Sequence, residues 1–430
     1  MGQPSDTSGG SASATDYVPR KGAARAWLIP IVLLVAGLVV GTGVGWYVAQ
    51  PPAKAAPMIV LGPWSGSEQA AFIPVLDLFT RTTGIPYEYR TARQEDLATD
   101  LPIDFAASRS RGDLIFMTSS FIKQAGADGH ASSLTGVVSE SGYAPGALDP
   151  VKNGSAIYGG AYTGKVKPGF WYRHSFFDAH GFQPPTTWAE FGTLLANIDT
   201  AIPGPNNAVL SGDPGWVLSD ITEHFIATYG GPTMHRQLTA GTLAWTDTSV
   251  RNVFANYLVP SLQSGHWSAP RNFQTGYSEF WAESYGLYFM GSWITVEAAI
   301  TDSTDLGVFS LPEAPGAKGI VFGPDYFFVP KYSTHLNDAK ELAKFLASEP
   351  AQEEQIRHGG NLATAKGVSI TDYPLVDAGV ARLLEGKEVL PDLDDTKGNP
   401  FSGVFWSQLK GLWADPTTLD TVLQNIQAAA

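Results

Sequence analysis

The chain has 430 residues, no cysteine, 12 tryptophans and a formal net charge of −14. This length is sufficient for two domains of ordinary size. The acidic balance argues against a nucleic-acid partner, because phosphate binding needs a basic surface, and the lack of cysteine excludes disulfides, thiolate metal sites and a lipid-modified cysteine.

The N-terminal stretch predicts a membrane anchor. Residues 1–25 are expected to be a disordered cytoplasmic tail that ends in a basic cluster. Residues 26–50 carry no charge, and this run is long enough to cross a bilayer core of about 30 Å as one transmembrane helix. The basic cluster before it places the rest of the chain on the extracellular side of the cell membrane, as a single-pass protein. Residues 51–57 are expected to be a linker. The alternative is a cleaved signal peptide with its cleavage site at 53–55.

After the linker, short apolar strands alternate with helical patterns. Strands are expected at 57–62, 85–90 and 113–117, with a helix at 67–84 whose apolar residues recur at helical spacing. Parallel strands joined by helices indicate an α/β fold with a doubly wound sheet.

Ligand sites of such sheets lie beyond the carboxyl ends of the strands. Here the first strand is followed by Trp64 and Ser65, and the third by Ser119 and Ser120. These side chains are therefore candidates for ligand contact.

A second α/β unit begins near residue 169. Its expected segments are 169–181, 184–198, 208–212, 215–231 and 249–265, then a strand–turn–helix over 286–299, strands at 305–312 and 320–331, and helices at 337–348 and 350–360. Pro260 is expected to kink or break its helix. No internal repeat is visible.

Six motifs in chain order resemble the family 1 extracellular solute-binding proteins of ABC importers, of the maltose-binding-protein type. The matching pieces lie at 58–90, 112–120, 159–191, 212–232, 286–293, and 322–333 together with 353–368. Each piece is weakly specific alone, but the order and spacing of all of them make a strong joint signal. The resemblance covers about residues 58–430.

The resemblance implies the two-lobed periplasmic-binding-protein-like fold of type II, in which two α/β lobes close over a ligand. Lobe one is expected from 58–158 and 286–330, and lobe two from 159–285 and 331–430. It also implies an extracellular protein, and not an enzyme, that captures a sugar or oligosaccharide and delivers it to the permease subunits of an ABC transporter. No cofactor is expected.

Sugars are polyols with apolar faces, so their sites combine aromatic platforms with carboxylates and amides. On residue type and on position within the resembling motifs, the candidate ligand contacts are Trp64, Ser65, Ser119, Ser120, Trp171, Asp213, Trp216, Asp220, Glu223, Trp293, Asp325, Tyr326 and Asn361.

Most candidates have a structural alternative. Trp293 follows Ser292 at what is expected to be the first turn of a helix, and a tryptophan is more commonly a core residue. Trp216, Asp220 and Glu223 share one helix face, where acids also form an ordinary solvated surface.

Asp325 could hold a hinge turn, Asn361 could end a helix, and the two serines after the third strand could begin one. Trp171 and Tyr172 lie on an alternating strand, so at most one of them faces the cleft.

Two other functions remain open. The chain could bind a peptide or another polar solute, for which charged groups would be needed at the peptide termini. It could also be a surface glycosidase that uses Asp220 with Glu223 or Asp213, which requires two carboxylates roughly 5–10 Å apart around the bond. The eight histidines show no paired helical spacing, so no metal site is predicted.

Overall fold

A computed structural model of the chain describes residues 56–143, 147–204, 207–312 and 319–430. Residues 57–430 form one compact unit. No helix within the described ranges is long and apolar enough to cross a membrane. The predicted cytoplasmic tail and transmembrane helix, and most of the linker, lie outside the described residues.

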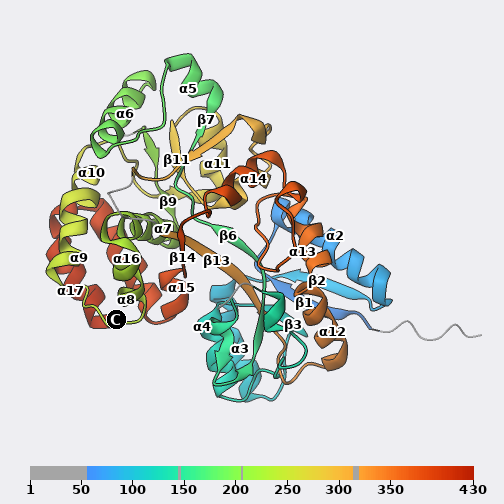
Figure 1. Cartoon of the computed structure of the whole chain (residues 1–430). Helices are drawn as coiled ribbons and strands as arrows, with labels where there is room; N and C mark the ends of the chain where they lie inside the picture. The colour runs from blue at the N-terminus through green and yellow to red at the C-terminus, as the bar shows by residue number, and fades with distance from the viewer. Residues whose placement is uncertain (1–55, 144–146, 205–206, 313–318) are drawn as a thin grey trace, which may run out of the picture. The chain divides into compact units, whose positions relative to one another are not determined.

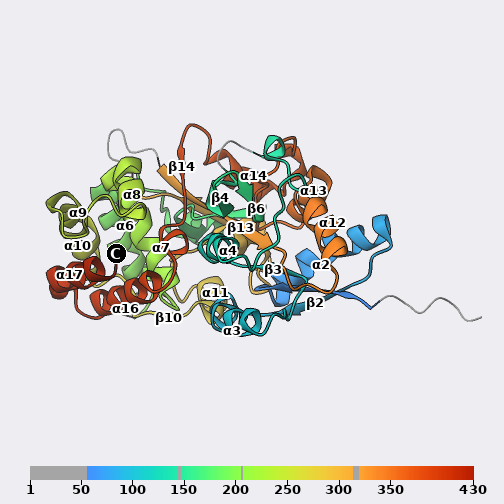
Figure 2. The ribbon, with the colours of Figure 1, turned by 90° about the horizontal axis from the view of Figure 1, so that it is seen from below.

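Two large hydrophobic cores divide this unit into two lobes, as predicted for an α/β fold of this kind. Val60, Phe72 and Phe116 belong to the core of lobe one. Phe170 and Phe225 belong to the core of lobe two. In Figures 1 and 2, the strands β6 and β13 lie between the helices of the two lobes.

Lobe one is a sheet with helices packed on it. Its elements are β1 (Met58–Gly62), α2 (Gly66–Thr83), β2 (Tyr87–Thr91), α3 (Gln94–Ala106), β3 (Leu114–Phe116), α4 (Ser119–Ala127), β4 (Lys152–Asn153), β5 (Ala156–Ile157), β6 (Gly159–Val166), α12 (Leu336–Leu346) and α13 (Glu349–Ile356), with the second half of β13 (Gly319–Phe328). The strand order is β2-β1-β3-β13-β6. Strand β1 is parallel to both β2 and β3, which confirms the predicted parallel pairing of the first three strands.

Helix α2 shows how local sequence sets these elements. Phe72, Val75, Leu76 and Phe79 recur at helical spacing and are all buried against the sheet. The helix ends where Gly84 adopts a left-handed conformation, with φ of 75°, and donates its N–H to Thr80 O. Gly84 therefore ends α2 at the residue where the predicted helix over 67–84 ends.

Lobe two contains a four-stranded sheet in the order β12-β7-β11-β8. Its elements are β7 (Phe170–Arg173), α5 (His174–His180), α6 (Trp188–Ala201), β8 (Val209–Leu210), β9 (Gly212–Asp213), α7 (Trp216–Phe225), α8 (Gly231–Thr239), α9 (Thr248–Val253), α10 (Val259–Gln263), β10 (Arg271–Asn272), α11 (Phe273–Trp281), β11 (Leu287–Phe289), β12 (Leu306–Phe309), α14 (Leu375–Arg382), β14 (Glu388–Leu390), α15 (Leu393–Lys397), α16 (Phe401–Ala414) and α17 (Leu419–Ala429). A π-helical turn, Phe254–Leu258, precedes Pro260 and separates α9 from α10.

The lobe-two sheet is buried on both faces. Side chains alternate along β7 and β11, so Phe170 and Phe289 enter the lobe-two core. Trp171 and Tyr288 point the other way, into a third cluster that also contains Trp293.

Strands β6 and β13 join the lobes as an antiparallel pair. The pairing extends from Phe322 opposite Val166 to Phe328 opposite Gly159. The start of β13 pairs with β14, while its end pairs with β3 in lobe one. A Cβ atom on Gly164 would lie 2.2 Å from the Phe322 ring, so a glycine is needed for this ring to lie across β6.

Sheet pairing and core packing divide two segments differently from the boundaries expected from sequence. The first part of 286–330 was expected in lobe one, but β11 pairs with β7 and β8, and β12 pairs with β7. The start of 331–430 was expected in lobe two, but α12 packs into the lobe-one core through Leu342 and Leu346. Which sheet a short apolar segment joins is decided by non-local pairing, which its own periodicity does not encode.

Candidate ligand-binding site

Two lysines lie at the end of β6, where the chain passes from lobe one to lobe two. Lys165 lies near the end of β6 and Lys167 directly after it, so the alternation of an extended strand turns both side chains to the same side. Their side chains are only 15% and 9% exposed. A buried ammonium group requires carboxylate partners, and each lysine has two.

Lys165 is paired with one carboxylate of lobe one and one of the hinge, the strand pair β6 and β13 that joins the lobes. Its Nζ lies 2.7 Å from Oε1 of Glu68 on α2 and 3.9 Å from Oδ2 of Asp325 on β13. The same nitrogen lies 5.7 Å from the centre of the Trp64 ring and 5.3 Å from that of Trp293. These distances are within the range of cation–π attraction.

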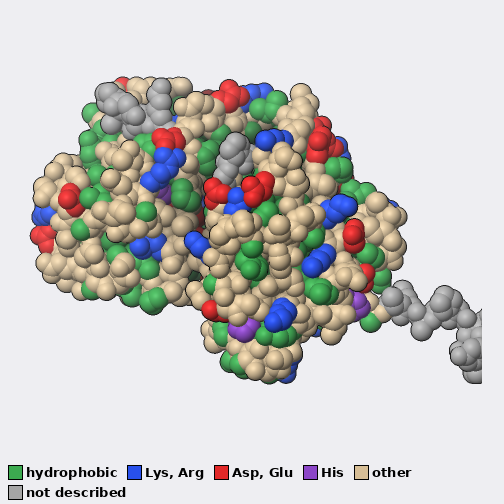
Figure 3. All heavy atoms as spheres, turned by 60° about the horizontal axis from the view of Figure 1, so that its bottom comes forward, with side chains coloured by type: hydrophobic (Ala, Val, Ile, Leu, Met, Phe, Trp, Pro, Cys, Tyr) green, Lys and Arg blue, Asp and Glu red, His purple; other side chains and the backbone are tan. Residues whose placement is uncertain are grey.

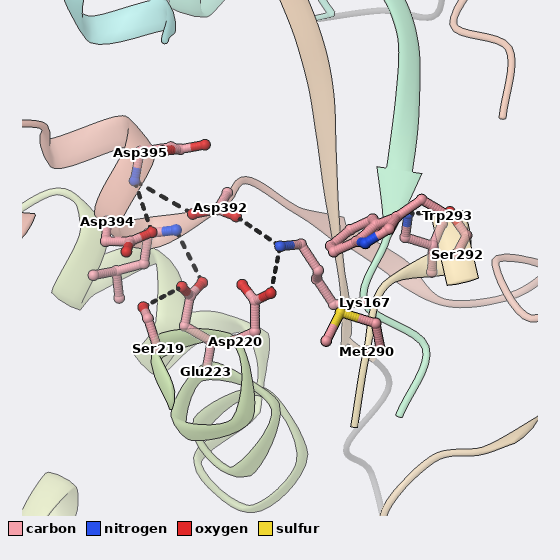
Figure 4. Close-up of polar contacts among 12 residues, drawn as sticks. Lys167, Ser219, Asp220, Glu223, Met290, Ser292, Trp293, Asp392, Asp394 and Asp395 are labelled. Atoms are coloured by element: carbon pink, nitrogen blue, oxygen red, sulfur yellow. Dashed lines mark hydrogen bonds and ion pairs between the residues drawn. The ribbon is translucent and has the colours of Figure 1, made fainter. Parts of the chain in front are cut away.

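Lys167 makes the equivalent contacts with lobe two (Figure 4). Its Nζ lies 2.6 Å from Oδ2 of Asp220 on α7 and 3.6 Å from Oδ2 of Asp392. The Trp216 and Trp293 ring centres are 5.5 and 5.1 Å away. Burial alone would lower the pKa of the Lys167 amine, but Asp220 and Asp392 outweigh it and hold this pKa above its usual value.

Trp293 is the ring that both lysines share, and its surroundings hold it firmly. It lies in a 3-10 turn, Ser292–Val296, and not in the first turn of the predicted α-helix. Its Nε1 donates to Tyr277 Oη at 2.8 Å, and its ring lies 5.8 Å from that of Trp216. The turn itself is tied down because Ser292 Oγ donates to Gly360 O at 3.0 Å.

Asp377 ties the same turn to the chain beyond α13. Its Oδ1 accepts hydrogen bonds from Gly360 N and from Thr295 Oγ1, each at 2.9 Å. Burial raises the pKa of Asp377 to about 6. The platform for Trp293 is thus assembled from two segments that are far apart in sequence.

A small cavity opens beside Trp64. Its volume is about 10 Å³, and it is lined by Trp64, Glu68, Phe72, Tyr162, Thr163, Gln355 and Asn361. This is room for roughly one water molecule. Asn361 is one of the lining residues, and its Oδ1 accepts a hydrogen bond from Thr163 Oγ1 at 3.2 Å.

Behind Lys167, further acids connect α7 to α15. Glu223 Oε2 accepts a hydrogen bond from Leu393 N at 2.9 Å and lies 2.9 Å from His235 Nε2. Burial lowers the pKa of His235 to about 4, so its imidazole is neutral at pH 7. The carboxylates of Asp220, Glu223 and Asp392 lie within 4.8 Å of one another; Lys167 supplies the positive charge beside them.

The lobes also contact each other directly, through α4 of lobe one and α15 of lobe two. Ser120 Oγ on α4 of lobe one donates to the Asp395 carbonyl oxygen on α15 of lobe two at 2.9 Å. Gly398 follows α15 with φ of 68°, and a Cβ there would lie 2.7 Å from Ser120 Oγ. This contact therefore depends on a close approach of the two chains.

The structure gathers six of the thirteen predicted site residues around the two lysines and the cavity. They come from both lobes and from the hinge, and are Trp64, Trp216, Asp220, Trp293, Asp325 and Asn361.

The other seven lie differently. Trp171, Glu223 and Tyr326 are buried and have their polar atoms bound within the protein: Trp171 Nε1 donates to Met290 O, and Tyr326 Oη to Ala147 O. Asp213 pairs with Lys410 at 2.5 Å on lobe two.

The three predicted serines begin helices. Ser65 is exposed before α2 and makes no side-chain cap there. Ser119 is buried in the first turn of α4, whose cap is Thr118. Ser120 makes the contact between the lobes described above.

Sequence reasoning missed Lys165, Lys167, Glu68 and Asp392. The signal for the lysines was present, because Lys165 and Lys167 alternate at the end of a strand that carries no other charge, and such a pattern predicts a buried polar contact on one face. The acids carry no comparable local signal, since the tertiary fold brings them to the lysines.

The chain is similar to known proteins over most of its length. The profile of the family described as bacterial extracellular solute-binding protein matches residues 63–353. A Pyrococcus horikoshii protein named an uncharacterized ABC transporter extracellular-binding protein is 42% identical over 412 residues, which cover 93% of this chain and 97% of that protein.

Solved structures share the fold at low sequence identity. A bacterial solute receptor described as having an exclusive preference for β-D-galactopyranose is 18% identical, with a TM-score of 0.75 over 86% of this chain and 97% of that one. A chitin oligosaccharide binding protein is 18% identical, with a TM-score of 0.73 and the same coverage. A maltose-bound T. maritima protein is 17% identical, with a TM-score of 0.71 over 87% of this chain and 98% of that one.

Proposed function

The chain belongs to the bacterial extracellular solute-binding proteins, and on this premise we propose that it captures a saccharide between its lobes and delivers it to the permease of an ABC transporter. The observation that carries the proposal is the meeting of three tryptophan rings with carboxylates of both lobes around Lys165 and Lys167.

The aromatic part of this site suits the apolar faces of a sugar ring. Trp64 belongs to lobe one, Trp216 to lobe two, and Trp293 is the ring over which both lysines lie. A pyranose ring stacked on one of these indoles would bury apolar C–H surface, while its hydroxyl groups point sideways.

The polar part suits those hydroxyl groups. Glu68, Asp325 and Asp220 are acceptors, the two lysines are donors, and Asn361 offers both kinds of group. Hydrogen bonds to charged groups are stronger than neutral ones, so such a site orients a polyol without needing a charge on it.

Closure of the lobes is the proposed link to transport. The cavity in the present conformation holds about 10 Å³, so a saccharide enters only when the lobes separate. Closure then buries the ligand and presents a different surface to the permease. The structural relatives whose names refer to galactopyranose, chitin oligosaccharide and maltose are consistent with a sugar as cargo.

The N-terminal segment adds a proposed location. A helix over 26–50 would hold the binding unit at the outer surface of the cell membrane. Such a tether raises the concentration of the binding protein near the permease. Fractionation of cells that express the full chain and a variant lacking residues 1–50 tests this: only the full chain is expected with the membrane.

We propose binding without catalysis. Asp220 is paired with Lys167 and Glu223 with His235 and Leu393 N, and both carboxylates are buried. A glycosidase needs two carboxylates that flank the scissile bond. Turnover of chromogenic glycosides that is lost in Glu223→Gln would contradict this proposal.

Thermal unfolding of the chain with a panel of mono- and oligosaccharides, and with short peptides as the competing class, tests the function. A saccharide at 100 times its dissociation constant is expected to add about 2.7 kcal/mol of stability. Stabilisation by peptides and by no saccharide would replace the sugar with a peptide ligand.

A further inference from the structure

The hairpin of β4 and β5 carries a motif that the proposed function does not use. Asn153, Gly154 and Ser155 form an Asn-X-Ser triplet, the only Asn-X-Ser or Asn-X-Thr triplet in the 430 residues. Such a triplet is the acceptor for N-linked glycans in proteins that leave the cytoplasm. The triplet alone is a weak signal, so its surroundings in the fold decide whether a glycan fits there.

The register of the hairpin turns Asn153 away from the protein. Asn153 pairs with Ala156, one step beyond the pair that contains Ile157. Residues directly opposite each other share a face of a strand pair, and successive residues alternate between the faces. Ile157 enters the lobe-one core, so Asn153 lies on the outer face, where it is exposed. Its side-chain amide makes no hydrogen bond with any residue within the described ranges.

Gly154 and Ser155 form the tip of the hairpin. Gly154 has φ of 60°, and the favoured two-residue turns need a positive φ at this first turn position. A Cβ atom on Gly154 would meet no atom within 4 Å apart from its chain neighbours. Ser155 is exposed as well. The tip therefore leaves room for a bulky group beside the Asn153 amide.

The base of the same hairpin is held by hydrogen bonds. Ile157 O accepts from Leu134 N at 2.8 Å, and Ile157 N donates to Thr135 Oγ1 at 3.0 Å. Tyr158 N donates to Val151 O at 3.0 Å. Folding therefore keeps the triplet at the surface, and an enzyme that modifies it has access both before and after the chain folds.

The hairpin lies well away from the candidate ligand-binding site. Its second strand leads into the start of β6 at Gly159, whereas Lys165 and Lys167 lie at the other end of β6. At about 3.3 Å per residue, roughly 20 Å of extended backbone separate the two places. A group attached to Asn153 is therefore not part of the ligand-binding site.

We propose that Asn153 is the attachment site of an N-linked glycan on lobe one. The donor is a glycan carried on a lipid phosphate, and a membrane-bound oligosaccharyl transferase joins the two. The amide nitrogen of Asn153 forms a bond to C1 of the first sugar, and the bond between C1 and the phosphate oxygen breaks. Its electron pair leaves with the lipid phosphate, and the amide releases one proton to a base. The proposal requires an extracellular lobe one, as in the family of this chain, and does not require that the ligand is a sugar.

Mass spectrometry of the full chain, purified from the cells that naturally make it, tests the proposal. Trypsin cleaves after Lys165, so the fragments that end there contain Asn153. We expect these fragments to carry a mass increase that corresponds to a chain of sugar residues. Fragmentation of the peptide should place this increase on Asn153.

Four variants, produced in the same cells, separate the triplet from its surroundings. Asn153→Gln and Ser155→Ala should each lose the added mass completely, because the acceptor amide or the hydroxyl of the triplet is missing. Ser155→Thr should keep it, since threonine supplies the same hydroxyl. Asn256→Gln is the matched control, because Asn256 is an exposed asparagine outside any such triplet, and it should leave the added mass unchanged.

The results that would overturn the proposal are distinct from those that bear on saccharide binding. Asn153 recovered without a glycan in the natural chain would overturn it, as would an added mass that lies on another residue or persists in Ser155→Ala. Any of these results leaves the proposed function intact. Failure of every saccharide to bind would overturn the proposed function, and a glycan found on Asn153 would still confirm the attachment site.

Discussion

The ammonium nitrogen of Lys167 lies 2.6 Å from Asp220 Oδ2, and this contact ties the chain leaving β6 to α7 of lobe two. Both side chains are almost fully buried, so neither charge has water as an alternative partner. Of the contacts in the site, this ion pair is therefore the one whose removal should reduce the free energy of unfolding most.

Lys167→Met should destabilise the protein by about 3–5 kcal/mol, because it leaves Asp220 and Asp392 as buried acids without their cation. Asp220→Asn should also destabilise it. The double variant should lose less than the sum of the two single losses, since it removes both members of the pair. Chemical denaturation of the four proteins measures this coupling, and strictly additive losses would show that the pair contributes no interaction energy.

Trp293→Phe should weaken saccharide binding at least tenfold while costing about 1–2 kcal/mol of stability. The smaller ring still fills the third core cluster, but the hydrogen bond to Tyr277 and part of the platform are lost. Calorimetry and denaturation measure the two effects separately.

Trp245→Phe is the control for this change. Trp245 is fully buried in the core of lobe two against Phe401 and Phe405, away from the lysines. It should lose stability and keep its affinity for sugar. Equal losses of affinity in the two variants would mean that Trp293 acts only as a core residue.

Asp377→Asn should stabilise the protein at pH 7.5 and have little effect at pH 4. The raised pKa of about 6 means that the folded state favours the protonated acid, so its stabilising contribution is complete below the unfolded-state value near 4 and is lost as pH rises through about 6. An amide keeps the acceptor for Gly360 N and Thr295 without the buried charge.

The expected gain above pH 7 is roughly 1–3 kcal/mol. Thermal unfolding between pH 4 and pH 8 measures it as a flatter dependence on pH in the variant than in the natural chain. A variant that loses stability equally at every pH would show that the carboxylate is needed in its ionised form.

Ser120→Ala should weaken saccharide binding about 2- to 10-fold by removing the hydrogen bond to the Asp395 carbonyl between the lobes. Gly398→Ala should weaken binding further, because it strains the backbone and brings a methyl group against Ser120. Ser348→Ala is matched to Ser120→Ala, since Ser348 also donates to a carbonyl oxygen but within lobe one. Affinity that falls equally in the Ser348 variant would remove the contact between lobes from the account.

The parts of the fold that local pattern determines could be predicted. The strand at 57–62 is β1, and the helix at 67–84 is α2 with its glycine cap. The sheet that β11 joins could not be predicted, because three apolar residues pair as well with one sheet as with another until the rest of the chain is in place.

The site shows the same division. Tryptophans and acids beyond strand ends could be identified from their positions, and Trp64, Trp293 and Asp220 do lie together. The depth at which Trp171 and Glu223 are buried could not be predicted, because it depends on segments distant in sequence: β11 pairs beside Trp171, and Leu393 contacts Glu223.

The sequence predicts the net charge of the surface, but not how the charged side chains are distributed over it. Figure 3 shows a face on which Lys and Arg side chains are scattered among acids and do not gather into a stripe. This face is consistent with the expectation from net charge that the partner is not a nucleic acid.

A crystal structure of the protein bound to the saccharide that gives the largest thermal shift tests the central proposal most directly. We expect a sugar ring between the lobes with one face on Trp293, Trp64 or Trp216, and with hydroxyl groups within about 2.6–3.2 Å of Glu68, Asp325 or Asp220. A saccharide bound elsewhere on the protein, without contact to any of the three tryptophans, would contradict it.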